Sequence, residues 1–255
     1  MSQTNKRIHF LDEIRGFAII CMVFFHAFYT MAFMFGWEIG RTLLEFFMPA
    51  EAYFAAAFVL ISGISSRLSR SNALRGARLA VIAALLTIVT VLLDEVFGMT
   101  GSSIYFGILH LLSAGMLFYA AVEKFAEKIP AWITAVVCGI IFAVTYNMQY
   151  GYIGIGPFLV EMPYELTRQT AFYPFFTNSA AFSSSDYFPI FPWIFMFMTG
   201  TAIGKYFKQG KIPKFFYVQH FKPFAFCGRH SLIIYLVHQP IIYVVCMAVS
   251  SIFKI

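Results

Sequence analysis

The sequence predicts an all-α integral membrane protein, a bundle of about seven transmembrane helices whose N-terminus lies in the cytoplasm. Of its 255 residues, 60% are hydrophobic and only 12% are charged, whereas a typical soluble domain is about half apolar and a quarter charged. The apolar residues form runs long enough to cross a bilayer, and the cationic residues lie between these runs. A soluble enzyme, a disordered segment and a disulfide-stapled secreted domain are therefore excluded.

Seven segments have the length of about 20 mostly apolar residues that a spanning helix needs. They lie at 16–36, 49–66, 79–97, 104–122, 130–147, 187–206 and 230–251. The first is too long for a cleavable signal peptide and no small-residue cleavage site follows it. No linker or internal repeat divides the chain, so we expect a single transmembrane domain over residues 1–255.

Two further segments could add half-helices and raise the number of helices to eight or more. Phe215–Phe226 is apolar but too short to span, so we expect an interfacial or half helix there. The segment Met148–Ser185 contains three prolines and three glycines, which argue against another full span and leave a re-entrant piece open.

The placement of lysine and arginine predicts the orientation. With the N-terminus inside, 15 of the 18 cations lie on the cytoplasmic side, and only Arg41, Arg168 and Lys254 lie outside. Cytoplasmic loops carry such an excess. The net charge of +6 therefore reflects membrane topology, and we expect no nucleic-acid partner. The segments Trp37–Met48 and Met148–Ser185 are expected on the outer face.

Three histidines lie inside predicted spans, where ionisable side chains are costly and often functional. His26 is the middle residue of an apolar run of nineteen, Phe17–Phe35, and thus lies about 14 Å from either end. His110 lies about 9 Å below the outer boundary, and His238 about 12 Å above the inner one. Each alone would be read as a buried histidine bonded to a neighbouring helix. Their similar depth favours a shared polar cavity.

Arginines form a second cluster on the cytoplasmic side. Two RxxR pairs occur within twelve residues, Arg67/Arg70 and Arg75/Arg78, and Arg15 lies at the start of the first span. The planar guanidinium group suits bidentate phosphate recognition. Topology and attraction to anionic lipid could explain the charge alone, but lysine would serve those purposes equally well.

Two carboxylates at predicted helix mouths complete the candidate substrate-binding residues. Glu51 is expected to open the second span and Asp186 the sixth, where Pro189 and Pro192 should bend the first turns. Such carboxylates are usually solvated caps. The alternatives are contact with a polar acceptor or orientation of a histidine. The four cysteines form no CxxC pair, and we expect no metal site.

An ordered set of motifs resembles the heparan-α-glucosaminide N-acetyltransferase catalytic-domain family of membrane acyltransferases. The Arg-x10-His spacing from Arg15 to His26 is also that of the acyltransferase-3 family. The motifs run from residue 10 to 242 and comprise Leu11-Asp12-x-x-Arg15-Gly16-x-Ala18-Ile19 with Met22-Val23-x-x-His26, Phe58–Gly63 followed by RxxR, Tyr105–His110, Phe188-Pro189-x-x-Pro192-Trp193, Gly200-x-x-x-Gly204, and Gly228-Arg229-x-Ser231-Leu232-x-x-Tyr235-Leu236-x-His238-Gln239-Pro240.

This resemblance implies an enzyme that takes an acyl group from cytoplasmic acyl-CoA and passes it to a glycan-like acceptor reached from the other face. By position, His26 would be the catalytic histidine and Arg67/Arg70 the pair linked to CoA recognition. In the lysosomal branch of the family, asparagine stands in place of His26 and the active histidine lies in the outer loop after the first span. The segment Trp37–Met48 contains no histidine. This excludes transfer through a histidine of that loop and weakens the case for an amino-sugar acceptor.

These observations together predict an acyl-CoA-dependent acyltransferase, with acetyl-CoA as the expected donor. Arg15, Arg67, Arg70, Arg75, Arg78 and Arg229 would contact the donor on the cytoplasmic side. The pantetheine arm, about 15–20 Å long, would bring the thioester to His26, which would act as a general base or as a transient acyl carrier. His110 or His238 would polarise the carbonyl or orient His26.

Two other functions stay open from the sequence. Two intramembrane histidines could ligate haem b, or the polar cavity could be the path of a transporter or flippase, although no inverted repeat is seen. The expected partners are acyl-CoA, membrane lipids and a glycan or lipid-linked sugar. We expect a multi-pass protein of a bacterial cytoplasmic membrane. Its oligomeric state, a homo-oligomer included, stays open.

Overall fold

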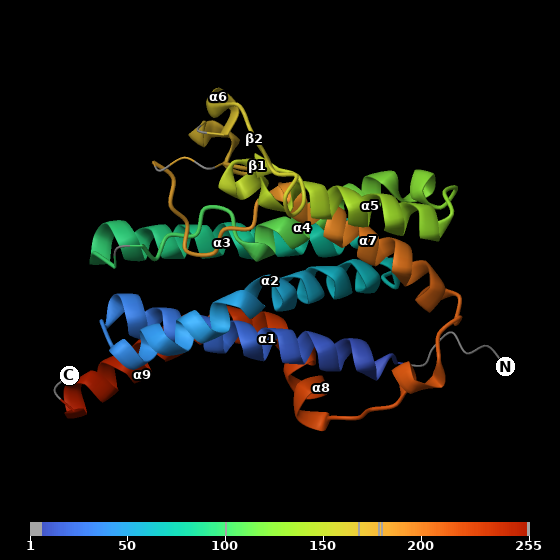
Figure 1. The fold of residues 1–255 in the computed structure, drawn as a ribbon. Coiled ribbons are helices and arrows are strands. Elements are labelled where there is room, and N and C mark those ends of the chain that lie inside the picture. The colour runs from blue at the N-terminus through green and yellow to red at the C-terminus, as the bar shows by residue number, and fades with distance from the viewer. Residues whose placement is uncertain (1–6, 100, 168, 178, 180, 254–255) are drawn as a thin grey trace. The chain divides into compact units, whose positions relative to one another are not determined.

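A computed structural model describes residues 7–99, 101–167, 169–177, 179 and 181–253. Three of the cations used to predict the orientation, Lys6, Arg168 and Lys254, lie outside these residues. The described chain is almost entirely helical (Figure 1). The long helices are α1 His9–Tyr29, α2 Glu38–Arg67, α3 Asn72–Phe97, α4 Ile108–Ala126, α5 Ala131–Thr145, α7 Ile190–Lys208 and α9 Ser231–Phe253.

Short elements fill the connections. They are the π-helical turn η1 Thr30–Met34, the 3-10 turns η2 Tyr146–Tyr150, η3 Thr170–Phe172 and η4 Lys214–Tyr217, the helices α6 Tyr164–Thr167 and α8 Lys222–Arg229, and the strands β1 Tyr152–Ile153 and β2 Val160–Glu161. The two strands pair antiparallel, with Tyr152 opposite Glu161. A short helix was predicted within Phe215–Phe226, and η4 and α8 occupy most of that segment.

Six of the long helices are long and apolar enough to cross a membrane: α1 with η1, α2, α3, α4, α5 with η2, and α9. The chain is therefore a multi-pass membrane protein. The sixth predicted span, 187–206, corresponds to α7, a helix of 19 residues that is not among the six. Its first turn is interrupted at Phe191, whose φ of −92° and ψ of 126° are not helical. The bend expected from Pro189 and Pro192 is thus present, since a residue that precedes proline avoids the helical region.

Helix surfaces show why lipid must surround the chain. Along α3, the side chains of Val81, Leu85, Ile88, Val89 and Leu92 are each more than half exposed. Their spacing puts them on one face of the helix. A soluble protein would not leave such a stripe in water.

Four helices begin at least four residues away from the start of their predicted spans. Two begin seven residues earlier, α1 at His9 instead of residue 16 and α3 at Asn72 instead of residue 79. The segment Trp37–Met48 was expected as an outer loop, but α2 already begins at Glu38 and contains Pro49. A proline removes one backbone hydrogen bond without ending a helix when its surroundings compensate. Glu51 therefore lies inside a helix of 30 residues, about 45 Å long, and does not open it. The fourth span begins at Ile108 and not at residue 104, because Thr90 Oγ1 accepts a hydrogen bond from the Ile104 N–H at 3.0 Å and holds that segment outside the helix.

The chain forms two compact units. The first contains the residues up to Ile61 and those from Ile212 onward, and the second contains Ser62–Lys211. In the first unit, helices α1, α8 and α9 pack on one another (Figure 1). In the second unit, α3 packs on α4, and α7 packs on both α4 and α5. The single domain predicted over residues 1–255 stays a prediction.

Candidate functional site

The first unit brings two of the three predicted histidines together. His26 of α1 and His238 of α9 have ring centroids 5.0 Å apart, with 56° between the ring planes. Both are buried, with exposed fractions of 8% and 7%. A pair of imidazoles on two different helices, inside an otherwise apolar run, forms a polar centre in the membrane-spanning part of the chain.

Hydrogen bonds define the proton positions of these two rings. His238 Nδ1 lies 2.6 Å from the Tyr235 carbonyl oxygen, which can only accept, so Nδ1 of His238 carries a proton. The Gln239 side-chain nitrogen Nε2 lies 3.5 Å from His26 Nδ1. An amide nitrogen can only donate, so His26 Nδ1 accepts and the neutral ring carries its proton on Nε2. Gln239 follows His238 in the sequence motif, but its role was not predicted.

Thr30 adds a buried hydroxyl one helical turn after His26. Its side chain is 1% exposed, and Oγ1 has no hydrogen-bond partner within the described part of the chain. Residues four apart lie on the same helix face. Thr30 also begins the π-helical turn η1, a rare element that is often found at functional sites. Leaving a buried hydroxyl unpaired is costly, so Thr30 offers a hydrogen bond to a ligand beside His26.

His110 lies apart from this pair in sequence and in its contacts, in the first turn of α4 in the second unit. Its Nδ1 accepts from the Gly107 N–H at 3.2 Å. Its Nε2 lies 3.2 Å from Thr87 Oγ1, which itself donates to the Ile104 carbonyl at 2.7 Å. The Thr87 oxygen therefore accepts from Nε2–H, and both nitrogens of His110 are occupied by its own unit.

Asp186 does not open the sixth span. It is buried, and its Oδ2 accepts from the Ile108 N–H at 3.0 Å. This carboxylate thus caps the N-terminus of α4, where a negative charge is favourable. Glu51, half-buried within α2, belongs to the first unit.

The arginines of the second unit fall into two kinds. Arg67 is 3% exposed, and its Nη2 lies 2.7 Å from Glu127 Oε1, while Nη1 donates to the Tyr119 hydroxyl. Lys205 Nζ is 3.5 Å from Glu127 Oε2. Arg70, Arg75 and Arg78 are exposed. The sequence did not reveal Glu127 as a partner, because it lies sixty residues after Arg67, directly after the end of α4.

The arginines of the first unit lie near the ends of helices α1 and α8. Arg15 Nη1 is 3.4 Å from Asp12 Oδ1, and Arg229, the last residue of α8, is exposed. The motif glycines next to them, Gly16 and Gly228, lie at a close helix contact: a Cβ on Gly16 would overlap the Phe224 carbonyl, and one on Gly228 the Asp12 carbonyl. Among the described residues, no group of three His, Cys, Asp or Glu side chains could hold a metal ion.

Comparison with known proteins agrees with the motifs. Residues 7–240 match the family model described as heparan-α-glucosaminide N-acetyltransferase, catalytic. No curated protein and no solved structure matches the chain. The matched region contains every predicted site residue. It ends within α9, at residue 240, so the second half of that helix lies outside the match. This polytopic membrane protein therefore belongs to the heparan-α-glucosaminide N-acetyltransferase catalytic-domain family.

Proposed function

We propose that the protein transfers an acyl group, an acetyl group in the first instance, from acyl-CoA to a hydroxyl or amine of a glycan or lipid-linked sugar. Membership of an acetyltransferase family supports the reaction class. The observation that carries the proposal for this chain is the buried pair of His26 and His238, with Gln239 beside them. A buried imidazole with a hydrogen-bonded neighbour is the usual arrangement of a general base.

His26 would accept the acceptor's proton as the acceptor oxygen or nitrogen attacks the thioester carbonyl. The C–S bond then breaks, and the CoA thiolate takes a proton as it leaves. In the neutral ring as described, Nδ1 carries the lone pair and accepts from the Gln239 NH2, so Nδ1 is not the nitrogen that would take the acceptor's proton. When the Gln239 amide turns over, its oxygen accepts from Nδ1–H, and the lone pair of neutral His26 is then on Nε2, which would take that proton. Gln239 would thus position His26 in both protonation states.

The other two histidines would act through their neighbours. His238, whose Nδ1–H is fixed by Tyr235, would present its second nitrogen to the acceptor or to the thioester carbonyl. His110 would hold the first turn of α4 in place, because both of its nitrogens are used there. Glu51 and Asp186 remain candidates for acceptor contacts.

The phosphates of CoA would bind on the cytoplasmic side near the N-terminus of α3. Ser71 caps this helix by accepting from the Leu74 N–H at 3.4 Å. A helix N-terminus attracts phosphate, and the exposed Arg70, Arg75 and Arg78 surround this one in sequence. Arg67 would support the cluster from its buried ion pair. Arg15 and Arg229 are proposed as further cationic contacts of the donor.

The test is transfer of labelled acetyl from acetyl-CoA to envelope glycans and lipids. His26→Gln keeps the shape and hydrogen bonding of the side chain but cannot accept a proton at neutral pH. Transfer should fall by at least about a hundred-fold, while CoA binding is retained. The matched control is His230→Gln, the same substitution at an exposed histidine, which should transfer at the wild-type rate. Wild-type transfer by His26→Gln would show that His26 is only a buried structural histidine.

A further inference from the structure

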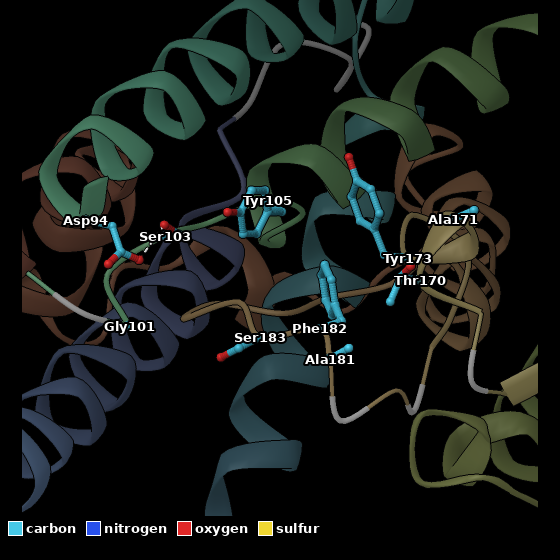
Figure 2. Close-up of a pocket in the computed structure, with 10 residues that line it drawn as sticks. All are labelled: Asp94, Gly101, Ser103, Tyr105, Thr170, Ala171, Tyr173, Ala181, Phe182 and Ser183. Atoms are coloured by element: carbon cyan, nitrogen blue, oxygen red, sulfur yellow. Dashed lines mark hydrogen bonds between the residues drawn. The ribbon is translucent and has the colours of Figure 1, made fainter. Parts of the chain in front are cut away.

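A cavity of about 600 Å³ lies in the second unit, between the residues that follow α3 and the segment that precedes α7 (Figure 2). It was not predicted from the sequence, and none of its lining residues has a role in the proposed transfer step. Its volume lies within the range of about 300–1,000 Å³ of small-molecule sites. The lining side chains that carry the argument are Asp94, Ser103, Tyr105, Thr170, Tyr173 and Phe182.

Aromatic rings form one wall of the cavity. Tyr173 and Phe182 are stacked, with centroids 5.2 Å apart and planes at 18°. Tyr105 lies 6.0 Å from Phe182 and 6.5 Å from Tyr173, as Figure 2 shows. Tyr187 supports this wall: its hydroxyl donates to the Tyr173 carbonyl at 2.8 Å. Burial raises the pKa of Tyr187 above its ordinary value, so this hydroxyl stays a donor at physiological pH.

Three hydrogen bonds join the two segments that border the cavity. Ser184 Oγ accepts from the Tyr105 N–H at 3.2 Å, and the Ser185 N–H donates to the Ser103 carbonyl at 2.9 Å. The Phe188 N–H donates to the Phe106 carbonyl at 3.1 Å. The aromatic wall is therefore formed before a ligand arrives, which reduces the entropy cost of binding.

The polar side of the cavity carries hydroxyls and one carboxylate. Asp94 Oδ2 accepts from the Ser103 hydroxyl at 2.6 Å, and the second carboxylate oxygen, Oδ1, can also accept hydrogen bonds. Thr170 and Ser183 add further hydroxyls. Of the described residues that line the cavity, none is cationic. A ligand with many hydroxyls can form hydrogen bonds here, whereas an anion would meet a carboxylate and, among the lining residues that the structure describes, no cation.

We propose that this cavity binds an uncharged sugar ring, with its C–H face against the aromatic wall and its hydroxyls toward Asp94 and the neighbouring side chains. The electron-rich face of an aromatic ring attracts the weakly positive hydrogens of such a face. A lipid chain could pack against the aromatic wall but would form no hydrogen bond with Asp94. An anionic sugar would be repelled by the charge of that carboxylate. The inference rests on the proposed function in one respect: the bound sugar would be part of the acceptor.

The test measures sugar binding by the full chain in lipid nanodiscs, without acyl donor. Nanodiscs are needed because alkyl glycoside detergents carry the very headgroup under test. Ligand-observed NMR titration should show binding of methyl β-glucoside and maltose and at least about ten-fold weaker binding of glucuronate, a difference of about 1.4 kcal/mol. Phe182→Ala should weaken glucoside binding by at least about ten-fold. Phe158→Ala, a matched change at an 81% exposed side chain outside the cavity, should bind as wild type does.

Two milder variants guard against misfolding. Asp94→Asn keeps the shape of the side chain and removes its charge, so it should bring glucuronate binding to within about three-fold of glucoside binding. Tyr173→Phe keeps the wall and removes one hydroxyl, so it should retain most of the binding. Equal glucoside binding by wild type and Phe182→Ala, or equal binding of glucoside and glucuronate by wild type, would overturn the proposal.

The same titration in His26→Gln separates the two proposals. Glucoside binding should be unchanged there, although transfer is lost. If the wild-type protein showed no transfer in any assay but bound sugar selectively, the acyltransferase proposal would be refuted and the proposed sugar site would be retained. Transfer without selective sugar binding would refute the sugar site alone.

Discussion

Neighbouring arginines of one sequence motif have different environments. Arg67 is buried beside Tyr119 and pairs with Glu127, whereas Arg70, three residues later, is exposed. A buried guanidinium needs partners, and removing it leaves those partners unsatisfied. An exposed arginine loses little stability when replaced and remains accessible to a soluble phosphate.

Replacing each of these two arginines by alanine should therefore give different results. Arg67→Ala should lower the free energy of unfolding by about 1–3 kcal/mol, measured by thermal or denaturant unfolding in detergent. Arg70→Ala should change it by less than about 0.5 kcal/mol and weaken CoA binding about ten- to a hundred-fold, measured by calorimetry. Full CoA affinity in Arg70→Ala would mean that this charge serves topology only.

Gln239 offers a second test at the scale of a single residue. Gln239→Leu keeps the approximate size of the side chain but can neither donate to nor accept from His26 Nδ1. We expect the rate of the transfer step to fall about ten- to a hundred-fold with the KM for acyl-CoA unchanged. Nitrogen NMR of labelled histidine should also show a changed tautomer balance at His26. An unchanged tautomer balance would rule out the positioning role.

The contact between helices α1 and α8 depends on two glycines. Gly16 faces the Phe224 carbonyl, and Gly228 faces the Asp12 carbonyl and the Gly16 nitrogen, without room for a side chain. Glu13 joins the same two elements, because its Oε1 accepts from the His220 and Phe221 N–H groups at 2.6 and 3.0 Å. Small residues allow such close helix approach in membrane proteins. The motifs of Arg15-Gly16 and Gly228-Arg229 are thus packing motifs as well as candidate binding motifs.

Gly16→Ala should separate α1 from α8 and lower the thermal stability, at a cost of about 1–3 kcal/mol. Gly139→Ala is the matched control, because a Cβ there has no neighbour within 4 Å in the described part of the chain. Since alanine is the better helix former by about 1 kcal/mol, this control should be as stable as wild type or more so. A tolerated Gly16→Ala would contradict the close contact.

Helices were predictable wherever apolar runs are long, and their ends were not where contacts distant in sequence decide them. The apolar pattern identified α5 and α9 with small boundary errors, and it placed the starts of α1 and α3 seven residues too late, because their first turns are polar. It placed the start of α2 too late, because Pro49 resembles a boundary while the turns before it are helical. His26 and His238 could be chosen for their depth. Gln239 and Glu127 could not, because a polar residue within a helix or directly after one gives no sign of its partner.

For the whole molecule, the composition predicted that lipid surrounds the helices, and the placement of the charges predicts their orientation in the membrane. Six helices are long and apolar enough to cross a membrane, and α7, which has two lysines in its last turn, is not among them. Whether α7 also crosses determines on which side its two ends lie. The cation bias predicts that the start of α3 lies in the cytoplasm and that the segment before α7 lies outside.

Cysteine labelling can test this orientation in a background without the four native cysteines. Ala73→Cys in the first turn of α3 and Ser185→Cys in front of α7 both occupy exposed positions. A membrane-impermeant reagent added to intact cells should label Ser185→Cys, and Ala73→Cys should react only after the cells are opened. Labelling of both from one side would contradict the orientation.

The π-helical turn at Thr30–Met34 has a consequence for insertions and deletions. A π-helical turn accommodates one residue more than an α-helical turn, so the chain tolerates an extra residue directly after His26. Deleting one residue of this turn would leave an ordinary α-helical turn, with the residues on either side facing nearly as before. Deleting one residue from the α-helical stretch between His26 and Thr30 would instead rotate Trp37 and the start of α2 by about 100° relative to His26. The length of that stretch should therefore be as strictly constrained as the identity of the histidine itself.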